Sequence, residues 1–140
     1  MFVLDTNILS AMMRLQLEPQ VKRWIAAHPA DLLFTTSLSQ AEILSGLAIM
    51  AEGRRRFDLE AAARAMFLEE FDGRVLPFDT KAATVYADIF AARRRAGRPA
   101  ATLDLMIAAV ALSRDASVVT RDTGGFEGCG ITLINPWQMS

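Results

Sequence analysis

Short apolar segments alternate with longer helical segments along the whole chain, and this alternation constrains the fold more than any other feature of the sequence. Strands that alternate with helices are joined by right-handed crossovers into a parallel sheet. The predicted strands are largely apolar, which is typical when helices cover both faces of the sheet. They are Met1–Leu4, Leu32–Thr36, Val75–Phe78, Ser117–Thr120 and Ile131–Ile134. We therefore predict a three-layer α/β fold built on a parallel sheet.

Helical spacing of apolar residues and helix-ending glycines place helices between these strands. Val21, Trp24 and Ile25 have helical spacing after Pro19, a residue that suits a first helical turn. Longer helices are predicted over Ser39–Met50, Arg54–Phe71, Thr80–Ala96 and Thr102–Arg114. The last of these is almost entirely apolar, so we expect it to be buried.

The length and composition are those of a single domain, residues 1–140. The chain has 140 residues, of which 52% are hydrophobic, enough for one sizeable core. The longest apolar run, Leu105–Leu112, has eight residues, whereas a membrane-spanning helix needs about 20. No charged leader precedes the first strand, and the single Cys129 suits a reducing compartment. We expect no membrane association and a cytoplasmic location.

Four acidic residues stand where a predicted strand ends or a predicted helix begins. Asp5 follows the first strand, and Glu42 lies early in the helix after the second. Asp104 opens the apolar helix, and Asp122 follows the fourth strand. In an open parallel sheet these positions fall on one edge, where four carboxylates would repel one another. Divalent cations relieve such repulsion, and oxygen ligands suit Mg²⁺ or Mn²⁺. The pattern therefore predicts a metal-dependent phosphodiester hydrolase.

Each of these acids also has an ordinary structural explanation. Asp5 could cap the next helix, since Asp is a preferred N-cap residue. Ser39 and Glu42 match a capping box, in which Glu bonds back to the amide of the cap residue. Asp104 could be a first-turn acid favoured by the helix dipole, and Asp122 could be an ordinary loop acid. The coincidence of all four at one edge of the sheet is what favours a metal site.

Asp79 provides an internal comparison for this argument. It also follows a strand and precedes a helix, but that strand is an outer one, away from the position where the strand order reverses. We predict that Asp79 is an N-cap and exclude it from the site.

Several short motifs along the chain carry a resemblance to a known family. They are Val-Leu-Asp-Thr-Asn-Ile-Leu-Ser at 3–10, Ser-x-x-Glu-Ile-x-x-Gly at 39–46, Asp-x-x-Ile-Ala-Ala at 104–109, Thr-Arg-Asp at 120–122 and Gly-Ile-Thr-Leu-Ile-Asn-Pro-Trp at 130–137. In this order and spacing they resemble the PIN domains, in particular the VapC-type toxins of bacterial toxin–antitoxin systems. Within these, the chain is most similar to the FitB-like or plasmid-stability branch. The resemblance covers essentially the whole chain.

This resemblance implies a fold, an activity and a set of partners. The fold would be a five-stranded parallel sheet of order 3-2-1-4-5 with helices on both faces. The activity would be a Mg²⁺- or Mn²⁺-dependent endoribonuclease that cleaves RNA and is neutralised by a small DNA-binding antitoxin. Operator DNA would be contacted only through that antitoxin. The resemblance also implies a homodimer formed through the regions Arg54–Phe71 and Thr80–Ala96.

The resemblance also assigns residue roles, one position at a time. The catalytic and metal-binding residues would be Asp5, Glu42, Asp104 and Asp122. Thr6 and Thr120 would be hydroxyls that orient these carboxylates. Many relatives have Asn at the position of Asp122 and an acid three residues later, where this chain has Gly125. Asp122 itself can serve as the fourth ligand.

The remaining polar and basic features have mainly structural interpretations. Asn7 is expected to cap the first helix, and Gly46 to allow close packing on the Glu42 face of its helix. The basic clusters Arg54–Arg56 and Arg93–Arg95 could steer RNA, although each alone is typical of a solvated helix end. The net charge of −1 argues weakly against a non-specific nucleic-acid binder but does not exclude a nuclease.

Two other functions fit parts of the pattern. A non-catalytic regulator with the same fold would act only by binding its partner and DNA, but an intact acidic quartet counts against it. A phosphatase with an aspartate nucleophile requires Asp-x-Asp after the first strand. This chain has Asp5-Thr6-Asn7 there, so the acid/base carboxylate is missing.

Overall fold

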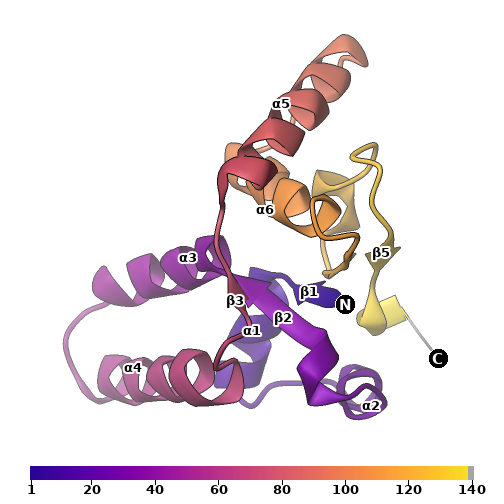
Figure 1. The fold of residues 1–140 in the computed structure, drawn as a ribbon. Coiled ribbons are helices and arrows are strands. Elements are labelled where there is room, and N and C mark those ends of the chain that lie inside the picture. Colours follow the sequence, from indigo (N-terminus) through magenta and orange to yellow (C-terminus); the bar gives the residue numbers. More distant parts are fainter. Residues whose placement is uncertain (139–140) are drawn as a thin grey trace.

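Strand β1 lies at the centre of a five-stranded sheet whose order is β3-β2-β1-β4-β5 (Figure 1). The structure is a computed structural model that describes residues 1–138. All four neighbouring strand pairs are parallel. The strands are β1 Phe2–Leu4, β2 Leu33–Thr36, β3 Val75–Leu76, β4 Ser117–Val119 and β5 Leu133–Ile134. The predicted fold class and strand order are confirmed.

Six α-helices cover the two faces of this sheet (Figure 1). They are α1 Thr6–Met13, α2 Pro19–Ala26, α3 Ser37–Ala48, α4 Arg54–Ala65, α5 Thr80–Arg95 and α6 Thr102–Leu112. Short helices complete the chain: η1 Ala30–Leu32, η2 Met66–Glu70, η3 Thr123–Gly125 and η4 Pro136–Gln138. Within residues 1–138, none of the helices combines the length and apolar character that crossing a membrane requires.

The core is divided by the sheet into two apolar clusters. Successive strand residues point to opposite faces, so Val3 packs with helices α5 and α6 while Leu4 packs with α1, α3 and α4. Val118 and Val119 of β4 divide in the same way between the two clusters. Helix α6 is buried along most of its length, as its apolar sequence predicts.

Three elements differ from the sequence prediction. The helix predicted over Arg54–Phe71 changes after Ala65 into a π-helical turn, η2, which keeps Met66, Phe67 and Phe71 all in the core. Strands β3 and β5 are shorter than predicted, with two residues each. These are the two edge strands, and only one side of each is paired within the sheet.

The strand order reverses at β1, whose neighbours are β2 on one side and β4 on the other. Chains leaving β1 and β2 start helices α1 and α3 on this edge of the sheet. In open α/β sheets the crevice at such a reversal, outside the carboxyl ends of the strands, is where ligands bind. This crevice is therefore the first place to look for a functional site.

Candidate active site

Asp5 is the buried centre of the crevice. Its backbone amide is fixed by the carbonyl oxygen of Val119 at 2.9 Å. One carboxylate oxygen caps helix α1 by accepting a hydrogen bond from the Thr6 amide at 2.8 Å, as the ordinary structural explanation predicts. The other accepts a hydrogen bond from the Thr120 hydroxyl at 2.9 Å. Asp5 thus caps a helix and also ties the end of β1 to the segment after β4.

Thr120 is fully buried, and its hydroxyl group makes hydrogen bonds with several residues around Asp5. Besides donating to Asp5, its hydroxyl oxygen accepts hydrogen bonds from the Asn7 amide group at 3.2 Å and from the Asp122 backbone at 3.1 Å. The prediction that Asn7 caps the first helix is wrong, because Asp5 holds that position. The side chain of Asn7 instead bridges α1 to Thr120 and to the backbone amide of Arg121.

Glu42 is held by Thr6 rather than by a capping box. The N-cap of α3 is Thr36, whose hydroxyl accepts from the Ser39 amide at 3.1 Å, so Glu42 lies a full turn inside the helix. Its carboxylate accepts a hydrogen bond from the Thr6 hydroxyl at 2.5 Å, and Thr6 also shares one with the Ser39 hydroxyl at 3.0 Å. Thr6 and Thr120 therefore each place a hydroxyl against one carboxylate of the predicted quartet.

Asp104 stands in the first turn of α6 and is partly buried. The pKa of its carboxyl is raised from 3.8 to about 6, chiefly by burial and also by the negative charges of Asp5, Asp122 and Glu42. The pKa of Asp5 is also raised, chiefly by its burial, against the opposing effect of its hydrogen bonds with Thr6 and Thr120. The four predicted acids are thus near enough to act on one another electrostatically.

A glycine turn closes over Asp104. Asp122 is exposed and is followed by η3, which contains Gly124 and Gly125. A β-carbon added at Gly125 would lie 2.6 Å from a carboxylate oxygen of Asp104, so there is room only for glycine unless that carboxylate moves. A β-carbon at Gly124 would lie 3.7 Å from a carboxylate oxygen of Asp122, an ordinary contact. Any side chain in place of Gly125 would therefore project at Asp104.

Asp79 lies outside this cluster, as predicted. Its carboxylate caps α5 by accepting from the Ala82 amide at 2.9 Å, and its other oxygen pairs with Arg114 at 3.3 Å. It follows β3, an edge strand, whereas Asp5 follows the central strand.

The donor set suits a hard divalent cation. All four candidate ligands are carboxylates, and oxygen ligands are those that Mg²⁺ and Mn²⁺ prefer. The raised pKa values of Asp5 and Asp104 mean that ionising these carboxyls destabilises the folded protein. A bound cation would remove that destabilisation. Among residues 1–138, no three of the side chains lie close enough to hold one ion without moving. A bound cation would therefore draw the more exposed Glu42 and Asp122 toward the buried acids.

Residues 2–128 match the family model described as the PIN domain. The chain belongs to the PIN-domain family. The resemblance noted in the sequence is thereby confirmed.

Three curated relatives align with nearly the whole chain, each over 99% of both sequences. The plasmid stability protein StbB of Pseudomonas syringae pv. tomato is 38% identical over 138 residues. The VapC ribonuclease Y4jK of Sinorhizobium fredii is also 38% identical over 138 residues. The toxin FitB of Neisseria gonorrhoeae is 33% identical over 138 residues.

A solved structure of FitAB bound to an IR36 DNA fragment contains a chain with the same fold. It superimposes with a TM-score of 0.92 at 32% sequence identity, covering 100% of this chain and 98% of that one. The five-stranded architecture is therefore shared with a toxin–antitoxin assembly over its full length.

Two contributors to the site were missed in the sequence. Ser39 was assigned to a cap, whereas it is fully buried and bonds to Thr6. Gly125 was considered only as a missing acid, whereas its lack of a side chain lets the turn approach Asp104. The spacing Thr36-x-x-Ser39 signals the true cap, since Thr is also a preferred N-cap residue.

Replacing Asp104 by Asn is expected to stabilise the metal-free protein at neutral pH. Folding raises the pKa of this carboxyl from 3.8 to about 6. The folded state therefore binds the proton more tightly than the unfolded state does, and stability falls as pH rises between these two values. Urea unfolding in EDTA should give Asp104→Asn a higher midpoint than wild type at about pH 8 and an equal one at about pH 3. Equal midpoints at both pH values would contradict this electrostatic account.

Substituting the two adjacent glycines should separate their roles. Gly125→Ala forces the Asp104 carboxylate to move and should weaken Mn²⁺ binding at least about tenfold, the scale for a lost orienting contact. Gly124→Ala makes only an ordinary contact and should bind Mn²⁺ like wild type. The measurement is the increase in thermal midpoint on adding Mn²⁺, which reports binding to the folded state. The interpretation fails if both variants respond to Mn²⁺ equally.

Proposed function

We propose that this chain is the toxin of a type II toxin–antitoxin system and acts as a Mg²⁺- or Mn²⁺-dependent endoribonuclease. The observation that carries the proposal is the mutual electrostatic influence of Asp5, Glu42, Asp104 and Asp122 at the reversal of strand order. Two relatives support it by name, one a VapC ribonuclease and one a toxin.

Each acidic residue of the crevice would have its own role in phosphodiester hydrolysis. Asp5 and Asp104 would hold the first cation, with Asp122 joining directly or through water, and Glu42 would hold a second cation or orient the attacking water. When bound, a divalent cation lowers the pKa of water and neutralises charge that grows on the phosphate. Thr120 and Thr6 fix the orientations of Asp5 and Glu42 through the hydrogen bonds described above. Asp5 and Glu42 are thus held in place, while the exposed Asp122 can adjust to substrate.

The alternative is a non-catalytic regulator with the same fold. Such a protein has no need to keep four carboxylates together at a cost in stability. The raised pKa values of Asp5 and Asp104 therefore favour the enzyme.

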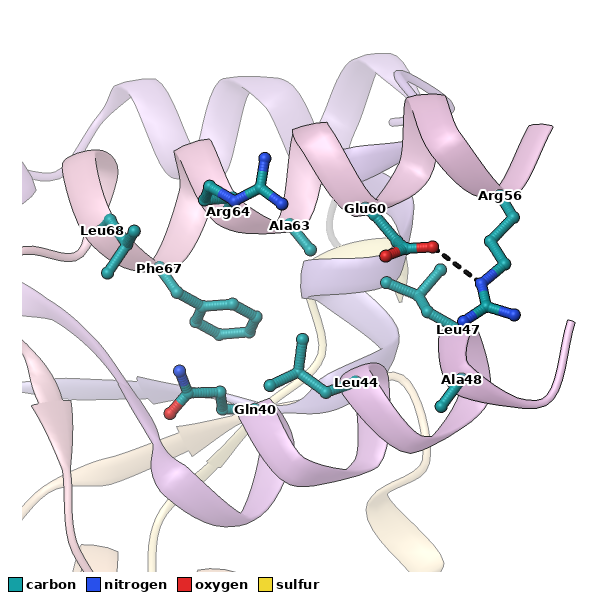
Figure 2. A pocket seen from close by; sticks show the side chains of 10 residues that line it. All are labelled: Gln40, Leu44, Leu47, Ala48, Arg56, Glu60, Ala63, Arg64, Phe67 and Leu68. Carbon is teal, nitrogen blue, oxygen red and sulfur yellow. Dashed lines mark hydrogen bonds and ion pairs between the residues drawn. The ribbon is translucent and has the colours of Figure 1, made fainter. Parts of the chain in front are cut away.

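A protein antitoxin is the expected partner, and the surface offers it two kinds of contact. A hollow of about 280 Å³ lies between α3 and the helical segment α4–η2. Its apolar lining includes Leu44, Leu47, Phe67 and Leu68, and Gln40, Arg56, Glu60 and Arg64 complete its polar part. Figure 2 shows Phe67 and Leu44 pointing into it from opposite sides. An apolar segment of the antitoxin would dock here. A basic side chain from the same partner would pair with the carboxylates of the crevice and exclude the cation.

The antitoxin would also supply the DNA contacts, so that operator DNA is bound only through it. The solved FitAB structure contains a DNA fragment. We further infer a homodimer through the regions Arg54–Phe71 and Thr80–Ala96. Phe57 and Phe90 in these regions are 70% and 41% exposed, which leaves apolar surface for a second copy.

Purified, antitoxin-free protein should cleave RNA with Mg²⁺ or Mn²⁺ and stop in EDTA. Asp5→Asn and Asp104→Asn should each lower the rate at least about tenfold, the scale of lost metal-site groups. Asp79→Asn is the matched control and should retain the wild-type rate, because Asp79 pairs with Arg114 away from the crevice. Gel assays of a labelled RNA provide the measurement. Chelator-resistant cleavage, or an equal loss in Asp79→Asn, would refute the proposed site.

A charge placed in the α3–α4 hollow should disrupt the antitoxin complex. Leu44→Asp should weaken binding at least about tenfold, because an unpaired charge in an apolar contact costs several kcal/mol. Leu32→Asp is a matched control, since Leu32 is similarly exposed, at 40% against 47%, but lies in η1 and not in the hollow. Titration calorimetry with the antitoxin encoded beside this chain measures both. Equal affinities of the two variants would exclude this docking site.

A further inference from the structure

Two connected hollows run along helix α1 away from the acidic crevice, and together we name them the α1 groove. The first, of about 200 Å³, begins at Thr6 and Glu42 and reaches Met13 and Arg14. The second, of about 590 Å³, shares Met13 and Arg14 and continues to the start of α4. Its remaining lining residues are Leu15, Gln16, Arg54, Arg55, Asp58 and Leu59. Of the candidate site, Glu42 and Thr6 therefore border a longer channel on the surface.

Gly46 keeps this channel open next to Glu42. The expectation that Gly46 allows close packing is wrong, because a β-carbon added there would meet nothing within 4 Å. Gly46 instead lines the first hollow, one helical turn after Glu42. Glycine inside a helix costs about 1 kcal/mol relative to alanine. The packing of the folded chain does not require this glycine, but the width of the groove depends on it.

The far end of the groove is positively charged. Arg14, Arg54 and Arg55 line it and are all exposed, against a single acid, Asp58. The pair of Arg54 with Asp58 is loose, at 3.6 Å with both side chains largely exposed. Within residues 1–138, Arg14 and Arg55 take part in none of the ion pairs. Exposed ion pairs of this kind contribute little, so these guanidinium groups are available to a ligand.

Two further arginines of the basic clusters, Arg56 and Arg93, are committed elsewhere. Arg56 is bound to Glu60 at 2.7 Å and to the Met50 carbonyl at 3.1 Å. Arg93 is buried and donates to the Arg98 carbonyl at 2.6 Å. Within the cluster Arg54–Arg56, the exposed arginines Arg54 and Arg55 therefore both line the α1 groove.

We propose that the α1 groove binds the phosphodiester backbone of single-stranded RNA on one side of the bond to be cleaved. This inference rests on the ribonuclease function proposed above. The groove follows α1 from Thr6 to Arg14, eight residues and so about 12 Å at the rise of an α-helix. That length accommodates three to four stacked nucleotides at about 3.4 Å each. The arginines would then meet phosphates a few nucleotides from the carboxylates.

The chemistry of the lining favours a nucleic-acid backbone over the other occupants. None of the residues lining either hollow is aromatic, so the groove lacks the stacking platform by which proteins grip bases. Recognition through phosphates alone tolerates any sequence. The α1 groove also has apolar residues in its lining, but its far end carries three arginines against one acid, and that excess of positive charge favours a phosphate backbone. An acidic peptide remains as the competing occupant to be tested.

Binding of a short fluorescent single-stranded RNA to the intact protein in EDTA tests this directly, because the proposed cleavage cannot occur there. Each single-strand phosphate contact contributes about −0.7 to the slope of log affinity against log salt. Arg14→Gln and Arg55→Gln should each reduce that slope by this amount and weaken binding about fivefold at about 0.1 M salt. Arg23→Gln is the charge-matched control, since Arg23 is exposed in α2 and lines neither hollow. It should change neither quantity.

A neutral variant tests the shape of the groove separately from its charge. Gly46→Leu improves helix propensity, so the chain should fold at least as well, yet its side chain would fill the first hollow and weaken RNA binding. The proposal is overturned if the two groove arginine variants and Arg23→Gln have equal affinity and slope. If the arginine variants bind the antitoxin more weakly but bind RNA like wild type, the groove is a site for an acidic peptide. If RNA binding depends on the groove but no cleavage follows on adding Mg²⁺ or Mn²⁺, the groove proposal is supported and the proposed ribonuclease function is refuted.

Discussion

Repulsion between like charges at the carboxyl edge of the sheet is the constraint on which the rest of this structure depends. Asp5 and Asp104 are held where burial and neighbouring acids raise their pKa values. The chain offsets this cost with hydroxyl donors from Thr6 and Thr120 and with two apolar cores that lock β1 between β2 and β4. The arrangement is most costly without a cation, which is the property expected of a site built to bind one.

Features set by local pattern could be predicted from the sequence. The periodicity of apolar residues predicts the α/β architecture. The positions of acidic residues at strand ends predict that they lie near one another, because parallel strands bring their carboxyl ends to one edge. For Asp5 the capping explanation is correct, and it uses only one of the two carboxylate oxygens. One oxygen caps α1 while the other binds Thr120. A capping residue at a strand end is therefore compatible with a functional site, and the two roles need not be weighed against each other.

Features set by contacts distant in the sequence could not be predicted. Thr36 and Ser39 are both good caps, and the end of β2 decides between them. Asn7 finds its partner 113 residues away, and Gly46 borders open space that only the packing of α1 against α3 defines. Adjacent Arg55 and Arg56 look identical in the sequence, yet only Arg56 lies within reach of Glu60 and the Met50 carbonyl.

The bond from Thr120 to Asp5 joins residues 115 positions apart. During translation, β1 emerges early but lacks its neighbour β4, and Asp5 lacks its hydroxyl donor, until nearly the whole chain has left the ribosome. Domains fold as units, so a growing chain of this protein presents no assembled acidic cluster. The acidic cluster can therefore form only after Thr120 has been synthesised and has reached Asp5.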